Sequence, residues 1–161
     1  MKIQFLSKQP IVPRTLIVPL PCYNSVYSTK MNFTYPKNEK LKSKIAIGLL
    51  FTEGKSVSKY PLRLVYNPGT FGEGEKIKIG VSVSKKYFKK AVDRNYFKRL
   101  LRETYRLNKH LLLDNLDQPY SFMFFYQSKD RLSYEEINTK TIQLFEKFLM
   151  QIKTVTENQE K

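Results

Sequence analysis

Residues 93–103, with the sequence DRNYFKRLLRE, mix basic and apolar side chains at intervals of three and four. At about 100° per residue of an α-helix, the five cations and the asparagine between residues 94 and 106 fall within an arc of roughly 140°, and five apolar residues between 96 and 107 occupy the opposite side. The polar arc contains Arg94, Asn95, Lys98, Arg99, Arg102 and Arg106. The apolar side contains Tyr96, Phe97, Leu100, Leu101 and Leu107. The spacing predicts an amphipathic helix that buries one face and presents five cations and an amide on the other.

Basic residues continue on both sides of this stretch. Between positions 76 and 110, twelve lysines and arginines accompany only Asp93 and Glu103, which is a net charge of +10 out of +15 for the whole chain. A solvated helix face usually mixes both signs, and a membrane-surface helix needs its apolar face free for lipid. Here the acidic residues are few, and the apolar face of the helix is expected to pack against the sheet. The charge therefore favours a polyphosphate partner, RNA or DNA.

Side chains that could perform catalysis or bind metal are sparse. One cysteine, Cys22, and one histidine, His110, can form neither an internal disulfide nor a metal cluster, which favours a reducing compartment, the cytoplasm. The acidic residues show no spacing typical of magnesium ligands, and this argues against a protein-only nuclease. No run of eighteen apolar residues occurs, and prolines interrupt the N-terminal region, so neither a membrane span nor a signal peptide is expected.

The first half of the chain predicts one helix and two strands. Apolar spacing over residues 41–51 predicts a short helix that stops at Gly54. Residues 59–67 predict a strand, and residues 75–85 alternate apolar and polar side chains with the period of two that is typical of a half-buried strand. The glycine-rich stretch between them, NPGTFGEGE, predicts a turn, so these two strands are expected to pair as a hairpin.

The second half predicts a helix, a strand and a helix. The basic helix is expected from Tyr87 to about Leu107, with a loop of turn-forming residues after it. Residues 120–127, YSFMFFYQ, form a short aromatic run that predicts a buried strand. Ser133 and Glu136 have the spacing of a capping box, which predicts the start of a last helix.

The two ends of the chain differ from its middle. Residues 1–30 lack periodicity and contain four prolines, so they are expected to be a disordered extension, with Met31 as an alternative start. Residues 31–155 are expected to form a single RNA-binding domain, and residues 156–161 a frayed tail.

The basic region resembles the signature of the bacterial ribonuclease P protein subunit. That pattern is a strand ending in Ser-Lys-Lys, followed by Ala-Val-x-Arg-Asn-Arg-x-Lys-Arg-x-x-Arg-Glu. Here the strand ends in Ser84, Lys85 and Lys86, and residues 91–103 read AVDRNYFKRLLRE. The order of elements from about 41 to 149, with Phe-x-x-Gly-Lys at 51–55, also fits.

The chain departs from the family pattern at three places. Tyr96 stands at the third position of Arg-Asn-Arg, and the helical arc assigns it to the buried side. Lys89 and Lys90 replace the usual glycine before Ala-Val. Ile47 replaces an aromatic residue one turn before Phe51, within the expected substrate site.

The resemblance implies that the chain is the protein subunit of a ribonucleoprotein endonuclease. Its RNA subunit would perform the metal-assisted removal of the 5′ leader from precursor tRNA, and the protein would bind both that catalytic RNA and the leader. No cofactor is expected on the protein itself, and Mg²⁺ is expected to serve the RNA-catalysed reaction. A general or ribosomal RNA-binding protein without a role in cleavage is the alternative, since it would share the charge and the fold class.

The resemblance also assigns residues to these partners. The expected contacts with the catalytic RNA are Lys85, Lys86, Lys89, Lys90, Arg94, Asn95, Lys98, Arg99, Arg102 and Arg106. The leader cleft is expected between the first helix and the sheet, with Phe51 and Tyr66 as candidates, because bases stack on aromatic rings. Core packing is an equal alternative for Phe51 and the favoured interpretation for Tyr66. It is also the main expectation for Phe122, Phe124 and Phe125, although one face of their strand could line the cleft.

The predicted fold class is α+β, a small two-layer α/β sandwich in the order α-β-β-(β)-α-β-α. If the strand over residues 77–83, the basic helix and the strand over residues 120–127 form a parallel crossover unit, general statistics favour a right-handed path. The resemblance implies instead a left-handed β-α-β crossover.

Overall fold

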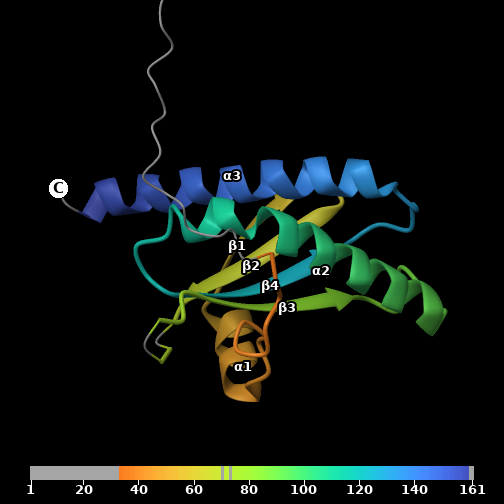
Figure 1. Cartoon of the computed structure of the whole chain (residues 1–161), viewed down its shortest axis with the longest axis horizontal. Helices are drawn as coiled ribbons and strands as arrows, with labels where there is room; N and C mark the ends of the chain where they lie inside the picture. The colour runs from red at the N-terminus through yellow and green to blue at the C-terminus, as the bar shows by residue number, and fades with distance from the viewer. Residues whose placement is uncertain (1–32, 70, 73, 160–161) are drawn as a thin grey trace, which may run out of the picture. The chain divides into compact units, whose positions relative to one another are not determined.

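The computed structural model describes residues 33–69, 71–72 and 74–159, which form three helices and a four-stranded sheet (Figure 1). In chain order the elements are α1 (Lys44–Thr52), β1 (Lys55–Lys59), β2 (Leu62–Pro68), β3 (Ile77–Val83), α2 (Ala91–Leu113), β4 (Tyr120–Tyr126) and α3 (Tyr134–Gln159). This order confirms the α+β class that the sequence predicts, with the optional third strand before α2 present.

Helix α1 is short because both of its ends are specified locally. The Oγ of Ser43 accepts a hydrogen bond from the N–H of Ala46, which makes Ser43 the N-cap, so the helix starts later than the predicted residue 41. The predicted glycine stop is confirmed. A Cβ at Gly54 would lie 2.1 Å from the carbonyl oxygen of Leu50, so only glycine fits where the chain turns from α1 into β1.

The sheet has the strand order β1-β2-β4-β3, which differs from the predicted pairing. Residues 59–67 are not one strand, because β1 and β2 form an antiparallel hairpin that turns at Tyr60 and Pro61. The expected hairpin of β2 with β3 was wrong, since β4 lies between them, antiparallel to β2 and parallel to β3. The physical reason is burial. β4 is buried almost throughout its length, and a central position covers its aromatic side chains on both faces.

The helices cover the two faces of the sheet unequally. Helices α2 and α3 pack on one face and α1 on the other, as Figure 1 shows. The α2/α3 face carries the main core, in which Phe122, Phe124 and Phe148 are fully buried. The α1 face carries a second, small core of Leu41, Leu50, Val65 and Met123. The two-layer body therefore has α1 as an additional element on its other side.

Strands β3 and β4 are parallel neighbours joined through α2, which makes them the expected crossover unit. The left-handed path of that unit stays a prediction.

Helix α3 begins as the sequence predicts. The N–H of Ser133 donates to Oε2 of Glu136 at 2.8 Å, and the N–H of Glu136 donates to Oγ of Ser133 at 3.3 Å, which confirms the capping box. Hydrogen bonds from Ser133 to the Glu136 carboxylate lower the pKa of Glu136. The helix continues to Gln159, beyond the predicted end of the domain at residue 155.

The predicted extension over residues 1–30 lies outside the described residues. Within the part of the chain that the structure describes, none of the helices combines the length and the apolarity that crossing a bilayer requires.

Candidate nucleic-acid interface

Helix α2 has the two faces that its spacing predicts. Phe97, Leu100 and Leu101 are buried against the main core. On the other side, Asn95, Arg99 and Arg102 are exposed, and Arg94, Lys98 and Arg106 are partly exposed. The four lysines that precede the helix, Lys85, Lys86, Lys89 and Lys90, are all exposed as well. The sequence-predicted cations are therefore exposed or partly exposed along α2 and the loop before it, and we call this set the α2 basic surface.

Arg94 is tied to the loop that leads into α2. Its Nη1 donates to the carbonyl oxygen of Phe88 at 3.0 Å and also to that of Lys89. This contact matters locally because Lys90, the N-cap residue, makes no side-chain capping bond. Arg94 thus fixes the basic loop against the first turn of the helix, and part of its donor capacity is used within the protein.

Arg106, at the other end of the surface, is also engaged. Its Nε donates to Oε2 of Glu103 at 2.9 Å, its Nη2 pairs with Oε1 of the same carboxylate, and its Nη1 donates to the carbonyl oxygen of Phe33 at 2.6 Å. The hydrogen bond from Arg106 holds the pKa of Glu103 below its usual value. All three nitrogens of the Arg106 guanidinium have partners within the protein, so this residue offers fewer free donors to an anionic ligand than the sequence suggests.

The centre of the α2 basic surface consists of Lys98, Arg99 and Arg102. Among the described residues these three make no ion pair and no side-chain hydrogen bond. Burial raises the pKa of the Tyr35 phenol. The positive charge of the nearby Arg102 acts in the opposite direction and lowers that pKa. Free guanidinium groups with planar, forked donors suit phosphate oxygens. The centre is thus the part of the surface best suited to an RNA backbone.

A buried ion pair fixes the segment 33–43 beside α2, and sequence reasoning missed it. Nζ of Lys109 lies 2.7 Å from Oε1 of Glu39, and the hydroxyl of Tyr105 donates to Oε2 of the same carboxylate at 3.1 Å. The backbone N–H of Ile79 donates to the carbonyl oxygen of Glu39, which joins the segment to the edge of β3. Lys109, one of the twelve cations in the basic region, is therefore buried and belongs to the structure.

The α1 face of the sheet presents the second candidate surface. Phe51, on α1, is 58% exposed, and its ring centroid lies 6.0 Å from that of Phe125 on β4. In the register of the sheet, Phe125 stands between Arg63 of β2 and Ser82 of β3. Arg63 is exposed and donates to Oγ of Ser56. Two aromatic rings and an arginine thus gather where α1 meets the sheet.

Tyr66 does not belong to this surface, and its assignment to the leader cleft was wrong. It is 3% exposed, and its ring packs against Phe148 of α3 at 4.7 Å and Tyr120 at 6.2 Å, on the opposite face of the sheet. Burial raises the pKa of Tyr66. The signal was present in the sequence. Tyr66 follows Leu62 and Leu64 at a period of two and therefore shares their buried face, whereas Arg63, which the prediction omitted, lies on the other.

Tyr96 was expected on the buried side of α2, and this was also wrong. It is 56% exposed, with its ring set edge-on to that of Phe97 at 5.2 Å. It lies at the margin of the apolar arc, in the second turn of the helix, beside an open hollow between α2 and the start of α3. Ile47, in contrast, is partly buried against the small core under α1.

The described residues contain no group of three or more His, Cys, Asp and Glu side chains arranged to hold a metal ion. What the geometry provides is two separated surfaces for a nucleic acid: the α2 basic surface, suited to phosphates, and the aromatic surface beside α1, suited to unpaired bases.

Comparison with known proteins identifies the family of the chain. The ribonuclease P family model matches residues 35–149. The ribonuclease P protein component of Porphyromonas gingivalis is 45% identical over 102 residues, which cover 62% of this chain and 74% of the relative. The ribonuclease P protein component of Dictyoglomus thermophilum is 34% identical over 116 residues, which cover 71% of this chain and 92% of the relative.

Solved structures share the fold. The ribonuclease P protein of Thermotoga maritima superposes with a TM-score of 0.56 at 23% identity, over 68% of this chain and 96% of that one. The ribonuclease P protein of Staphylococcus aureus gives a TM-score of 0.55 at 19% identity, over 67% of this chain and 93% of that one.

Proposed function

Because the chain belongs to the ribonuclease P protein family, we propose that it binds the catalytic RNA of ribonuclease P and the 5′ leader of precursor tRNA. Family membership implies a role in tRNA 5′ processing as part of an endonuclease. The observation that carries the proposal is the centre of the α2 basic surface, Lys98, Arg99 and Arg102, whose side chains have no ion pair or hydrogen bond with the described residues.

The catalytic RNA is assigned to the α2 basic surface. Each lysine or arginine that neutralises a phosphate releases condensed counterions, so a row of such residues supplies affinity without reading a sequence. The main core on the far side of α2 holds the helix rigidly, which fixes the spacing of the cations. Arg94, Asn95, Arg106 and the four lysines before the helix extend the contact from this centre.

The leader is assigned to the aromatic surface beside α1. Phe51 and Phe125 offer rings on which unpaired bases can stack, and such stacking contributes about 1–3 kcal/mol per base without requiring a particular base. Arg63, next to Phe125 in the sheet, can contact the backbone of the same strand. This replaces the predicted pair of Phe51 and Tyr66 by Phe51 and Phe125.

The hydrolytic chemistry is assigned to the RNA subunit, with Mg²⁺ held by that RNA. In this proposal the protein contributes binding and orientation of two RNAs, and it acts in the cytoplasm. Holding the leader on one face of the sheet and the catalytic RNA on α2 brings the substrate to the catalyst without the two contacts competing.

The test of function is cleavage of a precursor tRNA at low Mg²⁺ by the full chain alone, by a bacterial ribonuclease P RNA alone, and by both together. We expect efficient release of the leader only from the mixture. Cleavage by the protein alone would overturn the assignment of chemistry to the RNA, and a mixture no more active than the RNA alone would favour a general RNA-binding protein.

The test of the interface compares two pairs of charge removals. We expect Arg99→Ala with Arg102→Ala to weaken binding of the catalytic RNA strongly and to reduce the slope of log affinity against log salt by about 2. The control pair, Lys147→Ala with Lys153→Ala on α3, removes the same charge from exposed positions. Nζ of Lys147 donates to the carbonyl oxygen of Ser58, so melting temperatures must accompany the comparison. Equal losses for the two pairs would contradict the assignment.

A further inference from the structure

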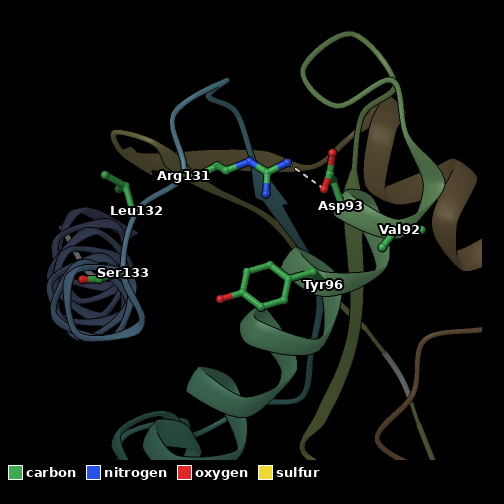
Figure 2. Close-up of a pocket in the computed structure, with 6 residues that line it drawn as sticks. All are labelled: Val92, Asp93, Tyr96, Arg131, Leu132 and Ser133. Carbon is green, nitrogen blue, oxygen red and sulfur yellow. Dashed lines mark ion pairs between the residues drawn. The ribbon is translucent and has the colours of Figure 1, made fainter.

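An open hollow lies between the first turns of α2 and the segment that leads into α3 (Figure 2). It is open to solvent and has a volume of about 490 Å³. Its lining consists of Val92, Asp93, Tyr96, Arg131, Leu132 and Ser133. Its α2 residues follow Lys89 and Lys90 of the α2 basic surface directly in the sequence.

Two side chains in the apolar part of the lining are largely exposed. Val92 is 76% exposed and Tyr96 is 56% exposed, one helical turn apart on α2. Figure 2 shows the Tyr96 ring directed into the space between the two helices. Neither side chain belongs to the hydrophobic cores of the described residues. The ring is therefore accessible to a ligand, and its removal would leave the main core intact.

The polar part of the lining is an ion pair. Nη2 of Arg131 lies 2.7 Å from Oδ1 of Asp93, with the arginine side chain 65% exposed and the aspartate 18% exposed. Asp93 is the one acid that lines the hollow, and this pair compensates its charge. A guanidinium has five N–H donors, so Arg131 keeps donors for a second anion after pairing with Asp93. The hollow thus combines an exposed aromatic ring with a guanidinium that can still bind phosphate.

We propose that this hollow binds one unpaired nucleotide of the catalytic RNA, with its base stacked on Tyr96 and a flanking phosphate at Arg131. The inference rests on the proposed function, because it takes the RNA on the α2 basic surface as the ligand. Charge favours RNA over a protein segment, since Lys89 and Lys90 precede the hollow and the chain carries a net charge of +15. Tyr96 stands where the family pattern has arginine. Tyrosine at this position lacks the positive charge of arginine and supplies an aromatic ring on which a base can stack.

The experiment measures binding of full-length protein to a bacterial ribonuclease P RNA at fixed salt. Tyr96→Ala is expected to lower the affinity by about 5- to 150-fold, the equivalent of stacking one base, whereas Tyr96→Phe is expected to stay within about twofold of the wild type. Met150→Ala, which removes another exposed apolar side chain, is the control. Thermal melting of each variant checks that the fold is retained.

A second readout locates the nucleotide. Chemical probing of the RNA in complex with the wild-type protein should show an unpaired nucleotide that is protected. That protection should disappear with Tyr96→Ala and persist with Tyr96→Phe, while protection elsewhere is unchanged. Arg131→Gln should reduce the salt slope by about 1, as expected for one lost phosphate contact.

The outcomes separate this inference from the proposed function. If Tyr96→Ala binds as well as wild type while the Arg99 and Arg102 double variant does not, the nucleotide site is refuted and the function stands. If Tyr96→Phe loses as much as Tyr96→Ala, stacking is refuted. If Tyr96→Ala changes only self-association in sedimentation, the hollow is a protein contact and the inference fails. A wild-type chain that does not stimulate cleavage refutes the function itself.

Discussion

The two faces of the sheet use the same strands for different purposes. On the α2/α3 face, side chains of β2 and β4 such as Leu64 and Phe122 are fully buried in the main core. On the α1 face, the buried core has only four of the described residues, and next to it Phe51 is exposed and Phe125 is partly exposed. Neighbouring residues of a strand point to opposite faces. A substitution on the α2/α3 face is therefore expected to change mainly stability, and one on the α1 face mainly binding.

The largest expected effect is on the α2/α3 face. Phe148 is fully buried, with ring centroids 4.7 Å from Tyr66 and 5.1 Å from Phe122. Phe148→Ala should lower the free energy of unfolding by about 3–5 kcal/mol, because it removes apolar contacts and leaves a cavity. Urea denaturation measures this. A loss below about 1 kcal/mol would show that the face is not the main source of stability.

The next effect is on binding at the α1 face. Phe51→Ala should change the free energy of unfolding by about 1 kcal/mol or less, because the ring is mostly exposed. In the assembled ribonucleoprotein it should weaken binding of precursor tRNA by about 1–3 kcal/mol, the contribution of one stacked base. Mature tRNA without a leader is the control substrate, and it should bind equally to both proteins. An equal loss for the two substrates would separate Phe51 from the leader.

Tyr66→Phe sharpens the difference between the faces with a smaller effect. The Tyr66 hydroxyl is buried and has no hydrogen-bond partner among the described residues. Removing it while keeping the ring should leave the free energy of unfolding unchanged or raise it by up to about 1 kcal/mol, because an unpaired buried polar group is unfavourable. Leader binding should not change. If the variant bound precursor tRNA more weakly but mature tRNA equally well, Tyr66 would have to be assigned to the leader site.

The smallest effect is a pH dependence at the start of α3. Hydrogen bonds from Ser133 lower the pKa of Glu136 below its ordinary value of 4.5 in the folded state. The ionised carboxylate therefore stabilises the fold at pH values above 4.5, and this contribution is lost as pH falls through the folded pKa. Glu136→Gln should melt slightly below wild type at neutral pH, and the difference should vanish in acid. A difference that grows in acid would contradict the assignment.

Much of the α2 basic surface could be predicted because helical periodicity is local. The spacing of Phe97, Leu100 and Leu101 specifies a buried face, and the cations on the other side follow from it. What spacing cannot reveal is which cations have partners within the protein. Glu39 is 70 residues from Lys109, and the carbonyl oxygen of Phe33 is 73 residues from Arg106, so these contacts exist only after folding.

Strand pairing was the least predictable part of the fold. The glycine-rich turn between β2 and β3 has the composition of a hairpin, yet it connects strands that β4 separates. Each strand sequence permits several neighbours, and the choice depends on burying the aromatic side chains of β4 from both sides. The assignment of Tyr66 to the cleft was wrong although the period of two in β2 places its side chain on the buried face with Leu62 and Leu64.

The sequence by itself determined the order of elements, the two faces of α2, the glycine stop of α1 and the capping box of α3. Each of these depends on residues within a few positions of one another, where spacing and capping chemistry decide the conformation. Only the tertiary structure decided that Phe125 stands beside Phe51 and that Tyr96 is exposed beside Arg131. Those properties depend on which distant element covers a side chain. That choice follows from burying the apolar surface of all the elements together, which no local segment specifies.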